Sequence, residues 1–266
     1  MREENLVLRD LATRSVEEAS AILESKGFKF TQKETKSSLS DLVTEVDQEI
    51  ESVIIDFLRS ERPYDSFLGE EGSRLSGSSG VKWVIDPIDG TTNFVYGIPG
   101  FGISVAAEKD GEIVAGAVAD PLHSEIFDAA RGFGSRCNRN TISINNEVNL
   151  GSSLIATGFS YSADQRKLQG KLLSHIIHEI SDIRRIGSAA VDLCWVAAGR
   201  VDAFFEEGLN YWDYAAGSLI ALEAGAVFKR IQNFLGAELI IATNPSIDDD
   251  FYALLVAARE KVVNDS

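Results

Sequence analysis

The sequence WVIDPIDGTTNF, residues 83–94, contains the pattern on which the interpretation of the whole chain depends. Its first three residues are apolar and are typical of the end of a buried strand. They lead into two aspartates, Asp86 and Asp89, which are followed by Gly90. Two carboxylates at the end of an apolar strand repel each other and resist desolvation unless a cation lies between them. The stretch therefore predicts a cation site.

Magnesium suits such a site because it is a hard cation that combines a few carboxylates with water and substrate phosphate. The restricted backbone at Pro87 can leave the carbonyl of Ile88 available as a further oxygen ligand. Gly90 permits a tight turn, after which the chain can begin a helix whose free N–H groups bind phosphate. A metal site and an anion site within one segment predict phosphoryl chemistry.

The spacing of the acids excludes two other kinds of acidic site. A phosphatase of the haloacid-dehalogenase kind would show Asp-x-Asp-Gly-Thr, whereas this chain has Asp-x-x-Asp-Gly-Thr. An EF-hand loop that begins at Asp86 needs an oxygen ligand at its third position and a glutamate at its twelfth. Those two positions are occupied by Ile88 and Gly97.

The composition is that of a globular chain, with 266 residues of which 44% are hydrophobic. Forty-one acidic residues against 25 basic ones give a net charge of −16, which argues against nonspecific nucleic-acid binding. No apolar run approaches the ~20 residues of a membrane span, and residues 1–10 are not expected to be a signal peptide. Cys137 and Cys194 have no pairing or metal-ligand spacing, so we expect a reducing cytoplasm. Together, the charge and the lack of a long apolar run predict neither nucleic-acid nor membrane partners.

Histidine chemistry has little support in this sequence. The chain has three histidines, His123, His175 and His178, and none lies in a catalytic pattern. A Ser-His-Asp mechanism is therefore poorly supported.

The hydrophobic spacing predicts a mixed α+β and α/β chain. Its first half, residues 1–150, is expected to form an antiparallel sheet with two helices and to carry the metal site. Its second half, residues 151–266, is expected to be α/β and to complete the substrate pocket. Residues 72–80 are expected to be a flexible connector. The expected elements are helices over 5–26 and 44–59, strands over 101–108, 113–120, 124–130 and 141–145, a hairpin turn at Asp110-Gly111, and alternating strands and helices from about residue 152.

Each acid outside the opening stretch also has a purely structural explanation. Thr44-x-x-Asp47 has the form of a capping box, and Asp213 stands at the start of a predicted helix. Glu70-Glu71 alone is typical of an exposed acidic turn. The acids at 248–250 are expected to cap the last helix and form its first turn.

Three motifs together resemble the inositol monophosphatase family, within the lithium-sensitive, metal-dependent phosphomonoesterases. They are DPIDGTTNF, GEEG at 69–72 and WDYAAG at 212–217. The segment from Lys36 to Asp47 and the stretch at 185–206 extend the resemblance, which covers about residues 5 to 260. It implies a layered αβαβα sandwich of the sugar-phosphatase type and a homodimer.

The resemblance also implies two or three Mg²⁺ ions. Glu70, Asp86 and the carbonyl of Ile88 hold the first ion, and Asp86, Asp89 and Asp213 hold the second. Glu70 helps with a looser third ion. The attacking water is oriented by Thr91, together with Glu70 or Asp47.

For the substrate, the resemblance implies that phosphate is bound beside Asp89 by the amides of Gly90 and Thr91. Glu206 contacts the polyol hydroxyls. Lys36 lies on a loop that closes over the site. The loop that lines the polyol pocket is formed by Gly187, Ser188 and Ala189.

The expected function is thus Mg-dependent hydrolysis of a phosphate monoester by a metal-activated water, with inositol-1-phosphate as the favoured substrate. Within the family, fructose-1,6-bisphosphate and histidinol phosphate remain alternatives. From another class, the alternative is a regulatory binding protein with vestigial or secondary phosphatase activity.

Overall fold

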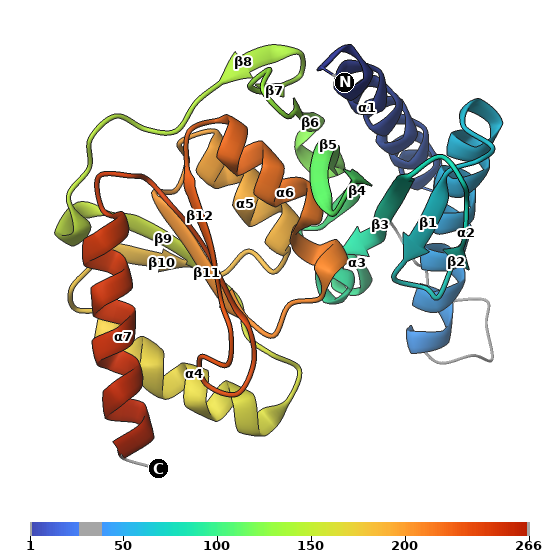
Figure 1. Ribbon diagram of the computed structural model, residues 1–266. Coiled ribbons are helices and arrows are strands. Elements are labelled where there is room, and N and C mark those ends of the chain that lie inside the picture. Colours follow the sequence, from blue (N-terminus) through green and yellow to red (C-terminus); the bar gives the residue numbers. More distant parts are fainter. Residues whose placement is uncertain (1, 27–38, 265–266) are drawn as a thin grey trace.

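The computed structural model describes residues 2–26 and 39–264. The predicted loop contact Lys36 lies outside these residues. Two sheets alternate with three layers of helices, so that the order of layers is αβαβα (Figure 1). Four separate apolar clusters fill the spaces between the five layers. The predicted layered, mixed fold is confirmed.

The first sheet has eight strands in the order β2-β1-β3-β4-β5-β6-β7-β8. All neighbours are antiparallel except β1 and β3, which run parallel, so the sheet is not purely antiparallel as expected. Strand β2 lies in the expected connector 72–80, and β7 lies between two expected strands. The sequence predicts neither strand, because two or three residues are too few to show a period. The strands are β1 Ser66–Gly69, β2 Arg74–Leu75, β3 Val81–Asp89, β4 Gly102–Lys109, β5 Glu112–Asp120, β6 Glu125–Ala130, β7 Ser135–Cys137 and β8 Asn140–Ile142.

Helices α1 (Arg2–Ser25) and α2 (Leu39–Glu61) cover the outer face of this sheet. They bury the apolar stripe that the sequence predicts, with Leu8, Ile50 and Ile54 fully inaccessible. Helix α2 begins five residues earlier than position 44. The capping-box explanation of Asp47 is therefore wrong, because Asp47 lies in the body of the helix.

The second sheet has five strands in the order β10-β9-β11-β13-β12, with β9, β10 and β11 parallel and β12 and β13 antiparallel to their neighbours. Its outer face packs against α4 and α7. The bounds are β9 Leu154–Thr157, α4 Ala163–Ile176, β10 Asp182–Arg184, β11 Ala203–Glu207, β12 Val227–Ile231, β13 Leu239–Thr243 and α7 Asp248–Asn264, with two 3-10 turns, η1 Pro121–His123 and η2 Leu150–Ser152.

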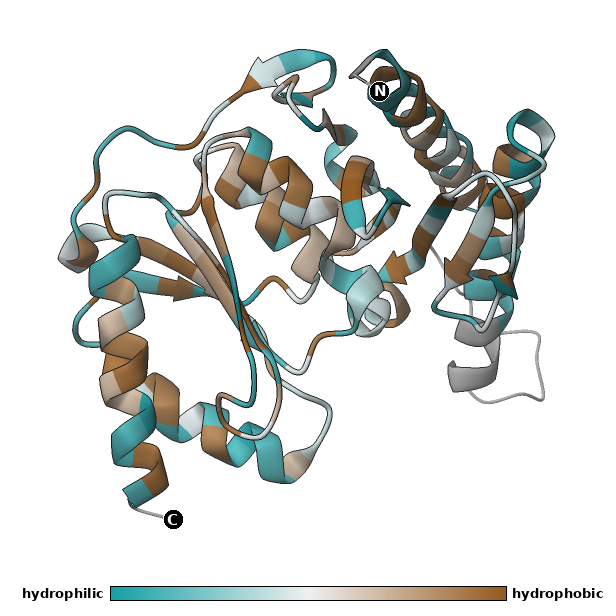
Figure 2. Cartoon of the chain, in the orientation of Figure 1, coloured by the Kyte–Doolittle hydropathy of each residue, from teal (hydrophilic) through white to brown (hydrophobic). Residues whose placement is uncertain are grey.

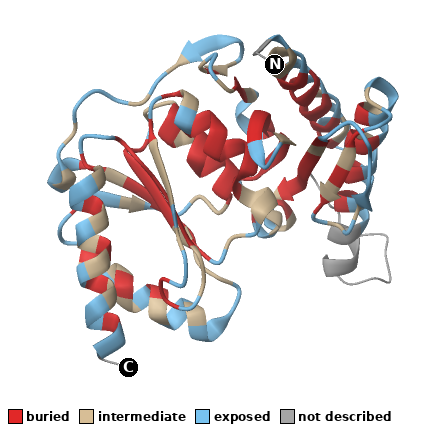
Figure 3. Cartoon of the chain, viewed as in Figure 1, coloured by how far each residue is buried: buried red, intermediate tan, exposed pale blue. Residues whose placement is uncertain are grey.

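The central layer consists of α5 (Ala189–Ala197) and α6 (Tyr211–Glu223), which pack against both sheets. Figure 2 shows how hydrophobic these two helices are, and Figure 3 shows that they are the most buried helices in that view. Leu193 and Val196 of α5 are buried inside the chain, as core packing predicts. Because α5 and α6 contact both sheets, the division of the chain at residue 150 stays a prediction.

Local predictions about single residues hold in several places. Asp110 and Gly111 turn the β4–β5 hairpin with φ of 53° and 80°, as an Asp-Gly pair predicts. Both cysteines are free, and Cys194 is buried. Within residues 2–26 and 39–264, no helix is both long and apolar enough to cross a membrane.

Candidate active site

Strand β3 brings Asp86 and Asp89 to one side of the sheet by means of a β-bulge. Asp86 lies opposite Ser104 of β4, whereas Asp89 lies opposite Gly102, so one extra residue is inserted on β3. In a regular strand, residues three apart point to opposite faces. The bulge at Pro87-Ile88 reverses this alternation, and both carboxylates line the same cavity.

The GEEG turn is held by a residue that the sequence does not reveal, Glu51 of α2. Its buried carboxylate accepts hydrogen bonds from the amides of Glu71 (3.0 Å) and Ser73 (3.3 Å). A Cβ on Gly69 would lie 2.1 Å from an oxygen of Glu51, so a larger residue there would displace the carboxylate that holds the turn. The amide of Glu70 bonds the carbonyl of Ile85 on β3 (3.1 Å), which places Glu70 beside the aspartates.

A short helix, α3 (Thr91–Tyr96), begins directly after the aspartates, as predicted. It starts at Gly90, which has a φ of 92°. A Cβ on Gly90 would lie 2.9 Å from the carbonyl oxygens of Gly100 and Gly187. Only glycine therefore fits where the loops meet.

The N-terminus of α5 holds Asp89. Both the hydroxyl of Ser188 (2.7 Å) and the amide of Ala190 (2.6 Å) donate to its Oδ2. Among the described residues, the other oxygen of Asp89 carries no hydrogen bond. Ser188 also caps α5, since its hydroxyl accepts from the amide of Val191 (3.2 Å). Ser188 is thus the N-cap of α5, and its contact with Asp89 links α5 to the acidic site.

Asp213 lies in the first turn of α6. Its Oδ2 accepts from the amide of Asn210 (2.7 Å) as one half of a capping box. The structural explanation of Asp213 is therefore confirmed as well. Its side chain nevertheless lines the same cavity as Asp86, so capping and a role in the site are compatible.

These segments enclose a cavity of about 570 Å³ that opens to solvent. One end is acidic, and Arg185 is the single cation among the described residues that line it. Residues predicted from the sequence that line it are Glu70, Asp86, Ile88, Asp89, Gly90, Thr91, Gly187, Ala189, Glu206 and Asp213; residues that the sequence analysis did not predict are Gly158, Phe159, Tyr161, Arg185, Leu209 and Asn210.

The acids of the cavity hold their protons unusually tightly. Burial, and then the charges of Asp89, Glu70 and Asp213, raise the pKa of Asp86 well above its ordinary value. Burial raises the pKa of Asp89 to about 6 and the pKa of Asp213 to about 8. These are the shifts that desolvation and like charge produce when no cation compensates them.

The oxygen donors of this end fit magnesium chemically. Asp86 Oδ1 is buried and has no hydrogen-bond partner among the described residues. The candidate ligand atoms of this site are carboxylate and carbonyl oxygens, which Mg²⁺ prefers. In the part of the chain that is described, no three such side chains already stand close enough together to hold an ion. Mutual repulsion of uncompensated carboxylates opposes that approach, and the magnesium site stays a prediction.

Among the described residues, no hydrogen bond joins Thr91 to Glu70 or Asp47, the residues predicted to orient the attacking water with it. The hydroxyl of Thr91 donates to the carbonyl of Ile88 (3.0 Å) rather than to Glu70 or Asp47. Asp47 is buried outside the cavity lining, and its Oδ1 has no hydrogen-bond partner among the described residues. Its pKa is raised to about 8 by burial and by the charges of Glu71, Glu70 and Glu51, so it lies in the field of the same cluster.

The cavity is also lined by Glu206, the residue before the last one of β11. Burial and the charge of Asp89 raise the pKa of Glu206 to about 8. A Cβ on Gly158 would lie 2.0 Å from the Glu206 carboxylate, so the backbone there packs directly on it. Glu207 points elsewhere and accepts from the amides of Leu235 (2.5 Å) and Ala237 (3.1 Å). The structure therefore places Glu206, and not its neighbour, in the cavity.

The chain matches a sequence model described as the inositol monophosphatase family over residues 5–263. It is 46% identical over 231 residues to a protein of Mycobacterium tuberculosis (strain H37Rv) named inositol-1-monophosphatase SuhB, covering 83% of this chain and 80% of that one. It is 41% identical over 213 residues to a protein of Escherichia coli (strain K12) named Nus factor SuhB, covering 78% and 80%.

A solved structure of Mycobacterium tuberculosis SuhB has the same fold. The TM-score is 0.83 at 40% identity, and the superposition covers 95% of this chain and 97% of that one.

Proposed function

The chain belongs to the inositol monophosphatase family and is a phosphoric monoester hydrolase, and we propose that it hydrolyses inositol-1-phosphate with the help of magnesium. The observation that carries the proposal is the cavity itself. Glu70, Asp86, Asp89 and Asp213 meet there from three distant segments, beside the start of α3.

The carboxylates are proposed to hold two or three Mg²⁺ ions. Glu70, Asp86 and the Ile88 carbonyl form one ligand set, and Asp86, Asp89 and Asp213 form another. When bound, these ions supply charge neutralisation and an acidified water. Two oxygens that accept no hydrogen bond from the described residues, Oδ1 of Asp86 and Oδ1 of Asp89, support this assignment.

The chain itself supplies positioning. We propose that the amides of Gly90 and Thr91 bind the phosphate, since the first amides of a helix lack partners within it. Thr91 orients the attacking water once its hydroxyl turns from the Ile88 carbonyl toward Glu70. Phosphoryl transfer depends mainly on such positioning and on charge stabilisation.

Glu206 is proposed to accept hydrogen bonds from the hydroxyls of the leaving polyol. Glu206 lines the same cavity as Gly187 and Ala189 of the predicted polyol-pocket loop. We further propose a cytoplasmic, lithium-sensitive homodimer; the two free cysteines fit a reducing compartment.

The test compares the wild type with Asp89→Asn on inositol-1-phosphate, fructose-1,6-bisphosphate and histidinol phosphate, each with Mg²⁺ and after chelation. We expect the highest kcat/KM for inositol-1-phosphate, loss of turnover on chelation, and a fall of two or more orders of magnitude in the variant. Turnover that survives exhaustive chelation would refute the metal assignment. A higher kcat/KM for fructose-1,6-bisphosphate or histidinol phosphate would identify that ester as the preferred substrate in place of inositol-1-phosphate.

A second candidate, a regulatory binding role, is favoured by the 41% identity to a protein named Nus factor SuhB. It does not require an active site. If the wild type hydrolyses none of the three esters at saturating Mg²⁺, this candidate becomes the better one.

A further inference from the structure

Two aromatic side chains, called the aromatic rim below, line the cavity on the loop that packs against Glu206. They are Phe159 and Tyr161, on the loop of residues 158–162 that joins β9 to α4. Tyr161 is 84% exposed, the highest value among the large hydrophobic side chains of the described residues. A single exposed apolar residue needs no explanation, but this ring stands at the mouth of the candidate active site.

The backbone of this loop is fixed by α4. Arg166 Nη1 donates to the carbonyls of Ser160 (3.0 Å) and Tyr161 (2.7 Å). The amide of Ser160 donates to Oε1 of the buried Gln169 (2.9 Å). The ring of Tyr161 is thus exposed to solvent, whereas its backbone is held by Arg166 and Gln169 of α4.

The same anchor reaches the proposed polyol ligand. Gln169 Nε2 donates to the carbonyl of Glu207 (3.3 Å), the residue that follows Glu206 on β11. Gly158, at the start of the loop, packs against the Glu206 carboxylate. The backbone that carries the aromatic rim is therefore joined through Gln169 to the strand that carries Glu206.

We propose that Tyr161, supported by Phe159, is a specificity-determining residue that stacks on the ring of the leaving alcohol. This rests on the proposed phosphatase function. A ring-bearing alcohol offers an apolar face to the tyrosine. Its hydroxyl groups can donate to Glu206 and accept from Arg185, which line the same cavity. An open-chain alcohol offers no such face. The site therefore selects phosphate monoesters of ring-bearing alcohols.

The experiment measures kcat and KM of Tyr161→Ala and Tyr161→Phe on inositol-1-phosphate and on the open-chain ester glycerol-2-phosphate. We expect Tyr161→Ala to lower kcat/KM for inositol-1-phosphate about three- to tenfold, through KM, as the loss of one ring contact predicts. Glycerol-2-phosphate should change less than twofold. Tyr161→Phe keeps the ring face and should behave as the wild type.

Tyr64→Ala is the matched control, because Tyr64 is 71% exposed and does not line the cavity. It should leave both esters unaffected. Equal losses on both esters in Tyr161→Ala, or no loss on either, would overturn the proposal, since the ring would then not discriminate leaving groups. A wild type that hydrolyses neither ester would instead overturn the proposed function, and the stacking role with it.

Discussion

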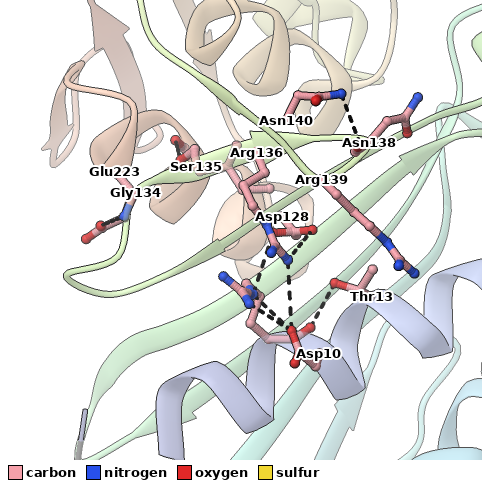
Figure 4. A network of polar contacts seen from close by, with 12 residues as sticks. Asp10, Thr13, Asp128, Gly134, Ser135, Arg136, Asn138, Arg139, Asn140 and Glu223 are labelled. Carbon is pink, nitrogen blue, oxygen red and sulfur yellow. Dashed lines mark hydrogen bonds and ion pairs between the residues drawn. The ribbon is translucent and has the colours of Figure 1, made fainter. Parts of the chain in front are cut away.

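Two aspartates of the same sheet, Asp128 on β6 and Asp86 on β3, are equally buried, each 1% exposed. Their surroundings are opposite in charge. Arg136 donates to Asp128 through Nε (2.7 Å) and Nη2 (3.1 Å), as Figure 4 shows. Arg9 Nε lies 3.7 Å from Oδ1 of Asp128. Asp86 has carboxylates as its charged neighbours and one oxygen without a partner.

The difference separates an acid that stabilises the fold from an acid that serves a site. A buried carboxylate is costly unless it is paired. At Asp128 the chain supplies the paired cations itself, from α1 and β7. At Asp86 the described residues supply no cation as a charged neighbour, and we infer that the compensating charge comes from solution.

The largest expected effect is a loss of activity when Asp86, the acid of the candidate site, is replaced. Asp86→Asn should lower kcat/KM by about 10³-fold, because it removes a charge shared by both proposed ion positions. The metal-free variant should melt no lower than the metal-free wild type, since the substitution relieves repulsion. Activity within tenfold of the wild type would contradict the role of Asp86.

A smaller effect is expected on the side of the fold. Asp128→Asn should reduce the free energy of unfolding by about 2 kcal/mol, because it removes the buried carboxylate that pairs with Arg136 and leaves the exposed Asp10 as the remaining acid beside Arg136 and Arg9. The kcat/KM of the folded variant should remain that of the wild type. Denaturant unfolding measures the loss.

Asp182→Asn provides the control for that measurement, because Asp182 is an exposed partner of Arg184. It should change stability little. An equal loss in both variants would show that burial does not set the importance of the Asp128 pairs.

The smallest effect is a dependence of stability on pH. The pKa is raised to about 6 at Asp89 and to about 8 at Asp213 and Glu206. A carboxyl with a raised folded-state pKa contributes stability below its unfolded pKa, and this is lost as the pH rises through the folded value. The melting temperature of the metal-free protein should therefore fall between about pH 4 and pH 8, by on the order of 5 °C.

Magnesium should reduce this fall, since a bound cation favours the ionised carboxylates. Thermal melts across the pH range, with Mg²⁺ and with chelator, check both statements. A metal-free protein whose stability rises with pH in that window would contradict the raised pKa values.

Local patterns predicted the helices, the Asp-Gly hairpin and the β3 aspartates because each depends on neighbours in the sequence. The parallel pairing of β1 with β3 and the early start of α2 were missed, because nothing within those segments signals them. Glu51 was missed for a related reason. Its function is to hold the amide of Glu71, which lies 20 residues further along the chain.

By itself, the sequence determined that two carboxylates end a buried strand before a glycine turn, and from these acids it predicted a cation site. Only the tertiary structure decided that the bulge turns both to one face, that Ser188 holds Asp89 from 99 residues away, and that Tyr161 stands over the same cavity. Composition and spacing record which groups are present and their local geometry. Distances between remote segments are set by the packing of sheets and helices against one another, and the chemistry of the site depends on those distances.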